Sequence, residues 1–184
     1  GFETLPEVNE ENPSYVEFIT GEGGVIDTWL RRGAAGFRLD VADELPDDFI
    51  EKIRAAVKRV SPEKFLLGEV WEDATTKYGF GQRRTYLLGK GLDSVMNYPF
   101  KNAVLDFVKG KPAEQAMGEI LSICEHYPAP AMDTALNFLS THDTERALTV
   151  IADEPANGRG REWQSGRCVV GEAYEEGMLR LRMA

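Results

Sequence analysis

Three short apolar runs in this sequence are each followed closely by a carboxylic acid. Asp40 ends the first run, Glu69 follows residues 65–68, and Asp143 comes shortly after residues 135–139. Buried parallel strands read as near-continuous apolar runs, and their carboxyl ends meet at one edge of the sheet. We therefore expect the three acids to converge. Two carboxylates flanking a sugar could act as nucleophile and proton donor in glycosidic bond hydrolysis, and a third could stabilise the positive charge that develops on the ring.

The arginine two residues before Asp40 supports this interpretation. Alternate side chains of an extended strand share a face, so Arg38 and Asp40 are expected to lie together. The positive charge of Arg38 would then keep Asp40 ionised. Glu69 follows four apolar residues, so we expect burial to raise its pKa and to make it the general acid.

Each acid also has a structural alternative. Asp40 could be only the ion-pair partner of Arg38 on an edge strand whose polar face meets water. Glu69 could cap a helix, and Asp143 could be the N-cap of a helix that begins at Thr144. The position of all three acids at strand ends of the same polarity favours the catalytic interpretation.

The elements that must position these acids alternate between strand and helix. Strands are predicted over residues 34–41, 65–70, 92–97 and 135–139. Helices are predicted over residues 13–19, 25–32, 46–60 and 172–183, with two more after Pro99 and Pro112. A long loop is expected over 71–91, with one helical turn near 84–88, and a surface loop over 153–171. This alternation predicts an α/β fold with a parallel sheet. A closed eight-stranded barrel usually needs ~250 residues, so the chain forms either a small open sheet or part of a barrel.

The overall composition limits the partners of the chain. Its 184 residues are 42% apolar and 28% charged, with a formal net charge of −10. This excess of acids argues against nucleic acid and against an anionic membrane surface, so a neutral substrate is the better match. Cys124 and Cys168 show no metal-type or disulfide-framework spacing. There is no apolar run of eighteen residues and no leader-like start, although a longer precursor could carry a leader. A cytoplasmic location is favoured over a secreted one.

Three motifs carry a resemblance to a known family. Residues 36–44 read GFRLDVADE, residues 68–71 read GEVW, and residues 138–143 read FLSTHD. In this order they resemble three successive signature regions of the alpha-amylase family, glycoside hydrolase family 13. The residues TER at 144–146, together with Asp43 and Glu44, are most similar to the neopullulanase and cyclomaltodextrinase branch.

The resemblance implies a role for each matching residue. Asp40 would be the nucleophile, Glu69 the acid/base and Asp143 the transition-state stabiliser. Arg38 would orient the nucleophile, and His142 would bind the sugar at the cleavage point. The implied reaction is retaining double displacement on α-glycosidic bonds of starch-type oligosaccharides, with nucleophile and acid/base carboxyls ~5–5.5 Å apart.

Three further residues flank the motifs and would face the leaving-group side of the cleft. Trp71 offers a flat apolar ring on which a sugar can stack, although it could equally be a packing residue of a lid. Asp43 and Glu44 would also line this side, but they could instead serve only as first-turn acids of the helix after Pro46.

One signature region of the family is missing. The aspartate followed closely by asparagine and histidine, which the family carries at its third strand, does not occur in this chain. The resemblance therefore implies one incomplete domain, residues 1–184, corresponding to the fourth to seventh strands of a (β/α)8 TIM barrel and their helices. A structural calcium ion is implied only for a longer parent protein, and no metal ligand is assigned here. We expect the chain alone to be inactive and to self-associate through exposed sheet edges.

Two other functions fit the same motifs. A non-catalytic glucan-binding or scaffolding domain could keep these residues without activity, although retention of all three acids argues against it. A transglycosylase or an isomerase of the same family would share the catalytic motifs, so the motifs do not separate these activities from hydrolysis.

Overall fold

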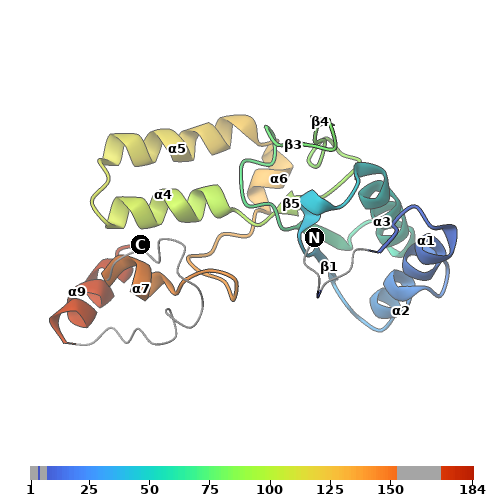
Figure 1. Ribbon diagram of the computed structural model, residues 1–184, viewed down its shortest axis with the longest axis horizontal. Helices are drawn as coiled ribbons and strands as arrows, with labels where there is room; N and C mark the ends of the chain where they lie inside the picture. The colour runs from blue at the N-terminus through green and yellow to red at the C-terminus, as the bar shows by residue number, and fades with distance from the viewer. Residues whose placement is uncertain (1–3, 5–7, 153–170) are drawn as a thin grey trace. The chain divides into compact units, whose positions relative to one another are not determined.

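The computed structural model describes residue 4, residues 8–152 and residues 171–184. The described residues belong to two compact units, one comprising Gly1–Met96 and His126–Leu136, the other Asn97–Glu125 and Asn137–Ala184. The predicted surface loop over 153–171 lies outside the described residues except for Gly171. Figure 1 shows the elements of both units along the chain.

The first unit contains, among the described residues, a three-stranded and a two-stranded sheet together with five helices. Its strands are β1 Gly36–Leu39, β2 Phe65–Gly68, β3 Tyr78–Gly79, β4 Gln82–Arg83 and β5 Ser94–Val95. Its helices are α1 Pro13–Thr20, α2 Val25–Arg31, the 3-10 helix η1 Ala42–Glu44, α3 Asp47–Val60 and α6 Ala129–Asp133. The second unit holds α4 Tyr98–Val108, α7 Ala147–Ala152 and α9 Glu172–Leu181, and α5 Ala113–His126 ends at the boundary between the units.

The main sheet is parallel, as the strand and helix alternation predicts. Its strand order is β1-β2-β5, and the register pairs Gly36 with Phe65 and Leu39 with Gly68. Gly36 allows the close approach of β1 and β2, because a Cβ atom there would lie 2.0 Å from the carbonyl oxygen of Phe65. The predicted α/β class with a parallel sheet is therefore confirmed.

Two sequence predictions in this sheet region are wrong in detail. The predicted strand over 135–139 is reduced to a single parallel bridge between Leu136 and Met96. Its neighbour β5 has only two residues, which leaves little edge for a further strand to pair with. The helical turn predicted near 84–88 is also absent: the Arg84 amide donates to the Lys77 carbonyl at 2.8 Å, which extends the β3–β4 hairpin instead.

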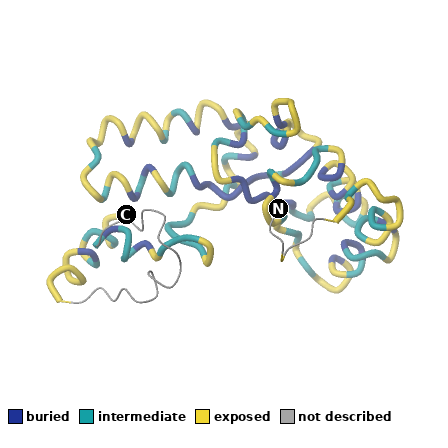
Figure 2. The backbone as a smooth tube through the Cα atoms, viewed as in Figure 1, coloured by how far each residue is buried: buried dark blue, intermediate teal, exposed yellow. Residues whose placement is uncertain are grey.

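Helix α3 shows how the sequence patterns produce the packing of the first unit. Asp47 and Asp48 lie in its first turn and Lys58 and Arg59 in its last, where each sign of charge complements the helix dipole. Its apolar stripe is buried and consists of Phe49, Ile50, Ile53, Ala56 and Val57. In Figure 2 the tube of α3, found by its place in Figure 1, alternates between buried segments in dark blue and exposed segments in yellow. Helix α3 packs against α1, α2 and β2.

Asp93, just before β5, ties α3 to β2. Its carboxylate pairs with Arg54 and Lys58, each at 2.7 Å, and accepts the amide hydrogen of Leu66 at 2.8 Å. The Asp93 side chain is only 17% exposed. This one acid therefore fixes the helix that precedes β2 and the first half of β2 itself.

The second unit is built from helices around a small apolar core. The buried residues Leu105, Ala147 and Ile151 pack with Leu139 and Leu181, among others. Helix α4 begins at the buried Asn97, whose Oδ1 accepts the Phe100 amide and whose Nδ2 donates to Asn137 Oδ1 at 3.0 Å. This core holds α7 against α4 and α9.

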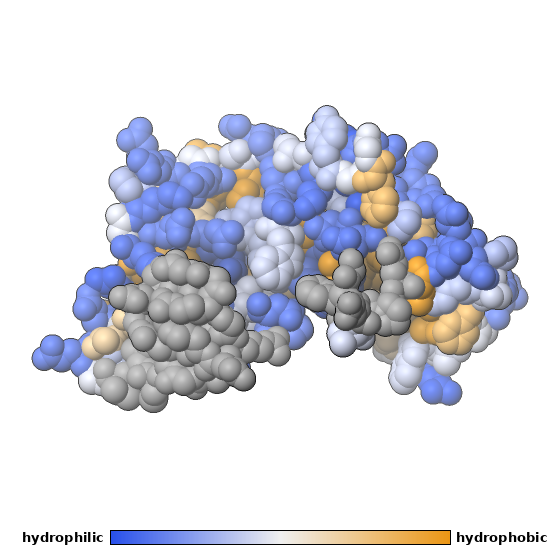
Figure 3. All heavy atoms as spheres, viewed as in Figure 1, coloured by the Kyte–Doolittle hydropathy of each residue, from blue (hydrophilic) through white to orange (hydrophobic). Residues whose placement is uncertain are grey.

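The surface and the helix lengths agree with the composition. Hydrophilic residues cover most of the face drawn in Figure 3, and apolar residues form separate small areas. Within residues 4, 8–152 and 171–184, no helix has the length and the apolar character needed to cross a membrane.

Candidate active site

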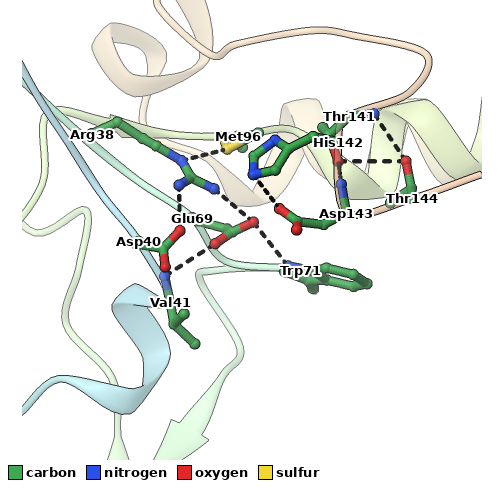
Figure 4. A network of polar contacts seen from close by, with 10 residues as sticks. All are labelled: Arg38, Asp40, Val41, Glu69, Trp71, Met96, Thr141, His142, Asp143 and Thr144. Carbon is green, nitrogen blue, oxygen red and sulfur yellow. Dashed lines mark hydrogen bonds and ion pairs between the residues drawn. The ribbon is translucent and has the colours of Figure 1, made fainter. Parts of the chain in front are cut away.

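Two of the predicted acids meet at the carboxyl ends of β1 and β2. Because Leu39 pairs with Gly68, the next residues along each strand are Asp40 and Glu69. A single guanidinium joins them: Arg38 Nη1 pairs with Asp40 Oδ1, and Arg38 Nη2 lies 2.8 Å from Glu69 Oε1 (Figure 4). The pairing of Arg38 with Asp40 was expected from the strand alternation, whereas its second partner was not.

Glu69 is the more enclosed of the two acids. Its residue is 3% exposed, whereas the Asp40 side chain is 69% exposed. Glu69 Oε2 accepts the amide hydrogen of Val41 at 3.0 Å, and Oε1 accepts the indole hydrogen of Trp71 at 3.2 Å. Glu69 follows β2 and begins no helix of its own, but its Oε2 bonds the amide of Val41, the N-cap residue of η1, so the helix-capping alternative holds in part. Both oxygens of its carboxyl group accept hydrogen bonds, so the orientation of the group is fixed.

Val41 has an unusual backbone conformation. Its φ of 45° and ψ of 50° are left-handed, a region that β-branched residues rarely adopt and that is retained where surrounding structure enforces it. This conformation places the Val41 amide against Glu69, in the turn that follows Asp40 and begins η1. The residue type gives no sign of it, so sequence reasoning missed Val41.

Arg38 is also tied to the third strand of the sheet. Its Nε donates to the Met96 sulfur at 3.4 Å, and Met96 directly follows β5. The guanidinium therefore contacts the ends of all three parallel strands through Asp40, Glu69 and Met96. Met96 lies in the predicted strand 92–97, but nothing in its type marked it as a partner of Arg38.

The three flanking residues lie in different surroundings. The Trp71 residue is 46% exposed, and its indole nitrogen donates to Glu69 Oε1. Asp43 pairs with Lys77 at 3.1 Å and its side chain is 17% exposed, whereas Glu44 is exposed. Both acids lie in η1, ahead of α3, so the alternative that they begin the helix after Pro46 is wrong.

His142 and Asp143 lie in the second unit and contact each other. His142 Nε2 is 3.0 Å from Asp143 Oδ2, with side chains 75% and 34% exposed (Figure 4). The turn is closed locally, because the Asp143 amide donates to Thr141 Oγ1 and the Thr141 amide donates to Thr144 Oγ1 at 2.9 Å. Helix α7 begins only at Ala147, so the alternative in which Asp143 caps a helix beginning at Thr144 is wrong.

The described part of the chain does not assemble a metal site. In residues 4, 8–152 and 171–184, no group of three or more histidine, cysteine, aspartate or glutamate side chains could hold a metal ion. No calcium ligand set is therefore assigned to these residues.

The family comparison agrees with the motifs. Residues 1–165 match the family model described as "Alpha amylase, catalytic domain". The chain is 37% identical over 151 residues to a cyclomaltodextrinase from a Bacillus species, covering 79% of this chain and 24% of that protein. It is 34% identical over 157 residues to neopullulanase 2 from Thermoactinomyces vulgaris, covering 84% of this chain and 25% of that protein.

The structural comparison points the same way. The fold resembles the cyclic α-maltosyl-(1→6)-maltose hydrolase from Arthrobacter globiformis in complex with that cyclic sugar, with a TM-score of 0.68 and 28% identity. The match covers 77% of this chain and 30% of the other. The present chain thus spans about a quarter of the two curated relatives described above. From the family match and the signature motifs around Asp40 and Glu69, the chain belongs to the alpha-amylase family and corresponds to part of its catalytic domain.

Proposed function

We propose that this chain carries the catalytic acids of a retaining α-glucan hydrolase that acts by double displacement. The observation that carries the proposal is the guanidinium of Arg38, which joins Asp40 and Glu69 at the ends of two neighbouring parallel strands. Two carboxyls held on one guanidinium are close enough to act on the same glycosidic bond, and the retaining mechanism requires a short separation of ~5–5.5 Å.

In the first step of the proposed reaction, a carboxylate oxygen of Asp40 attacks the anomeric carbon of the sugar. The bond from that carbon to the leaving oxygen breaks, and the carboxyl proton of Glu69 passes to this oxygen. Asp40 is the exposed acid that a substrate can reach, and Arg38 keeps its carboxylate in place. The Val41 amide and the Trp71 indole fix the orientation of Glu69 as the proton leaves.

In the second step, Glu69 accepts a proton from water as the water oxygen attacks the same anomeric carbon. The ester to Asp40 breaks, and the sugar is released with its original α configuration. Asp143 stabilises the positive charge on the sugar ring in both transition states, and its neighbour His142 binds the sugar at the cleavage point.

The substrate class follows from the relatives and from the surface around the site. The relatives are named cyclomaltodextrinase and neopullulanase, and one similar hydrolase was solved with a cyclic maltosyl-maltose. We therefore assign α-glucan oligosaccharides as the substrate class of the enzyme that contains this chain. The half-exposed Trp71 ring is a stacking surface for a sugar on the leaving-group side, with Asp43 and Glu44 nearby in sequence along η1.

The decisive experiment examines the enzyme expressed from the complete reading frame that contains this sequence. Proton NMR of maltotriose cleavage is expected to show the α anomer of the product first. An activated fluorosugar that slows the second step is expected to label Asp40, as located by peptide mass spectrometry. An initial β anomer, or a label on another residue, would disprove the assignment.

The chain itself is proposed to be one incomplete domain, residues 1–184, corresponding to strands four to seven of a (β/α)8 barrel. Misplacement of catalytic groups by ~1 Å can cost ~100-fold in rate, so the 184-residue chain alone is expected to release no measurable reducing sugar from maltotriose. Turnover by this chain that disappears in the Asp40→Asn variant would contradict this expectation.

An incomplete barrel is also expected to associate through its sheet edges. Among the described residues, β1 pairs only with β2 and leaves its outer edge open, and open strand edges are templates for pairing with another chain. Light scattering of the 184-residue chain is expected to show dimers or larger species, whereas a monodisperse monomer would rule this out.

A further inference from the structure

Arg84 is a fully buried arginine in the loop that follows the acid/base strand. Its side chain has an exposed fraction of 0%. A buried guanidinium is tolerated only when its charge is paired and its hydrogens are bonded. Arg84 lies 37 residues beyond its ion-pair partner Asp47, so its contacts join two distant segments of the first unit.

The hydrogen bonds of the guanidinium all go to one of these segments, which comprises the link between β1 and α3 and the first residue of α3. Its Nε donates to Asp47 Oδ1 at 2.8 Å, its Nη1 to the carbonyl of Asp43 at 2.8 Å, and its Nη2 to the carbonyl of Leu45 at 2.5 Å. The two carbonyls lie in and just after η1, where a helix leaves carbonyl groups without partners in its own backbone. Arg84 thus closes the C-terminal end of this 3-10 helix.

Two aromatic rings hold the guanidinium in this position. Its central carbon lies 5.1 Å from the ring centre of Phe80 and 4.5 Å from that of Tyr86, distances at which a cation is attracted to an aromatic face. Phe80 has a left-handed φ of 51°, which non-glycine residues adopt only where surrounding structure requires it. A second cation of the same loop, Lys77, pairs with Asp43.

The segment that Arg84 binds begins at the residue that contacts the acid/base. Val41 is the N-cap of η1, and its amide donates to Glu69 Oε2 at 3.0 Å. The left-handed conformation of Val41 is costly for a β-branched residue, so it needs support from contacts further along the segment. The bonds from Arg84 to Asp43 and Leu45 supply that support within four residues of Val41.

We propose that Arg84 is a positioning residue for Glu69, which acts by fixing residues 41–47 and thereby the Val41 amide that orients the Glu69 carboxyl. This inference rests on the proposed acid/base role of Glu69. Among the described residues, the guanidinium of Arg84 hydrogen-bonds to Asp43, Leu45 and Asp47 and not to Asp40 or Glu69, so it acts on Glu69 through residues 41–47.

The test compares Arg84→Met with Arg84→Lys in the enzyme expressed from the complete reading frame. For Arg84→Met we expect kcat on maltotriose to fall about 10-fold while KM changes by less than about 2-fold, because the reacting groups lose alignment and the sugar contacts remain. Arg84→Lys keeps one charged donor and is expected to recover part of kcat.

A second measurement does not depend on activity. Hydrogen exchange of the Val41 amide, followed residue by residue, is expected to become about 10-fold faster in Arg84→Met because local opening of this segment becomes easier. The matched control is Arg83→Met. Arg83 is exposed and donates only to the Thr75 carbonyl in its hydrogen bonds, so this variant should change neither kcat nor the Val41 exchange rate.

Each outcome decides the proposal. A lower melting temperature in Arg84→Met, with kcat and Val41 exchange both unchanged, would show that Arg84 only stabilises the fold and would overturn the inference. If Arg84→Met does not fold, Arg84→Lys and Asp47→Asn give the same two readouts. Full activity in Glu69→Gln would instead disprove the proposed function, and in that case the exchange measurement still reports whether Arg84 fixes Val41.

Discussion

Asp40 and Glu69 lie at the ends of two paired strands, whereas Asp143 lies in a turn that is closed by two threonines. The contacts of Glu69 join residues 28 positions apart in the sequence, and its side chain is 4% exposed. The turn at Asp143 is closed by bonds that span two or three residues, and the neighbouring His142 side chain is 75% exposed. The bonds that orient Glu69 thus join distant segments of the first unit, whereas the two bonds that close the turn at Asp143 lie within four consecutive residues of the second.

This difference separates two ways of fixing a functional acid. The positions of Asp40 and Glu69 depend on the sheet register, on Arg38 and on Val41. A change in any of these should therefore shift the two carboxyl groups. The turn at Asp143 has in addition two bonds of its own, from the Asp143 amide to Thr141 Oγ1 and from the Thr141 amide to Thr144 Oγ1. Variants in the two regions should consequently differ in stability as well as in activity.

The largest expected effect is the loss of activity in Glu69→Gln. Removal of a general acid/base costs about 10²- to 10⁴-fold in rate, and reducing-sugar release by the enzyme from the complete reading frame is the measurement. Glu72→Gln is the matched control, since Glu72 is an exposed acid of the same loop that pairs with Lys77. Activity of Glu69→Gln within tenfold of the parent would break the assignment.

A large difference in stability is expected between Arg38→Met and His142→Ala. Arg38→Met removes one charged partner of the buried Glu69 side chain, a loss that costs several kcal/mol when the pair is fully buried. Because the Arg38 side chain is 31% exposed, we expect a loss of about 2 kcal/mol in the free energy of unfolding by urea, discounted for solvent screening.

His142→Ala should change the same free energy by less than about 0.5 kcal/mol, as is usual for exposed positions. Equal losses in the two variants would show that the turn at Asp143 depends on tertiary contacts as much as the strand pair does.

The stability of the sheet that carries Asp40 and Glu69 should also depend on pH, because Asp93 ties α3 to β2. Burial acts to raise the pKa of Asp93, but its bonds to Lys58, Arg54 and the Leu66 amide outweigh burial and hold the pKa below the ordinary value of 3.8. A lowered folded-state pKa gives stability that is present above the unfolded pKa of about 3.9 and is lost as the pH falls through the folded value.

Asp93→Asn is accordingly expected to lower the free energy of unfolding by about 1–2 kcal/mol at pH 7. The difference from the parent should begin to shrink below about pH 4, where the unfolded parent chain binds the proton, and should close as the pH falls through the lowered pKa of folded Asp93. Urea unfolding at a series of pH values tests this, and a constant difference down to pH 2 would contradict it.

The smallest loss of activity is expected for Trp71→Phe. The phenyl ring keeps a stacking face but loses the indole hydrogen that Glu69 Oε1 accepts. One such hydrogen bond contributes about 1 kcal/mol, so kcat/KM should fall about 5-fold. Trp71→Ala removes the ring as well and should lower kcat/KM further, and equal losses in both variants would exclude stacking.

The sheet could be predicted from the sequence because its signals are local. The apolar runs around Phe37 and Leu66 mark buried strands, and the alternation within the first run places Arg38 beside Asp40. The parallel register then follows from the helix between the two strands. These features depend on residue types that lie next to one another in the chain.

The contacts around Glu69 could not be predicted, because they depend on backbone geometry and on distant residues. No property of valine indicates that Val41 is left-handed. Arg84 lies in a polar stretch that predicts only a loop, and its burial results from rings and carbonyls brought together by the fold. The strand expected at 135–139 was too long because its extent depends on the two-residue strand β5 and not on its own apolar residues.

The bonds of Asp93 have a consequence for synthesis of the chain on the ribosome. Leu66 is made 27 residues before the carboxylate that accepts its amide hydrogen, which is about one to five seconds at 5–20 residues per second. During that interval the Leu66 amide lacks its acceptor and Arg54 and Lys58 lack the carboxylate that pairs with them, although Lys58 can already donate to the carbonyls of Pro62 and Lys64. The nascent β1–α3–β2 segment therefore reaches its native packing only after Asp93 has left the exit tunnel, and until then it depends on water or a chaperone to cover these groups.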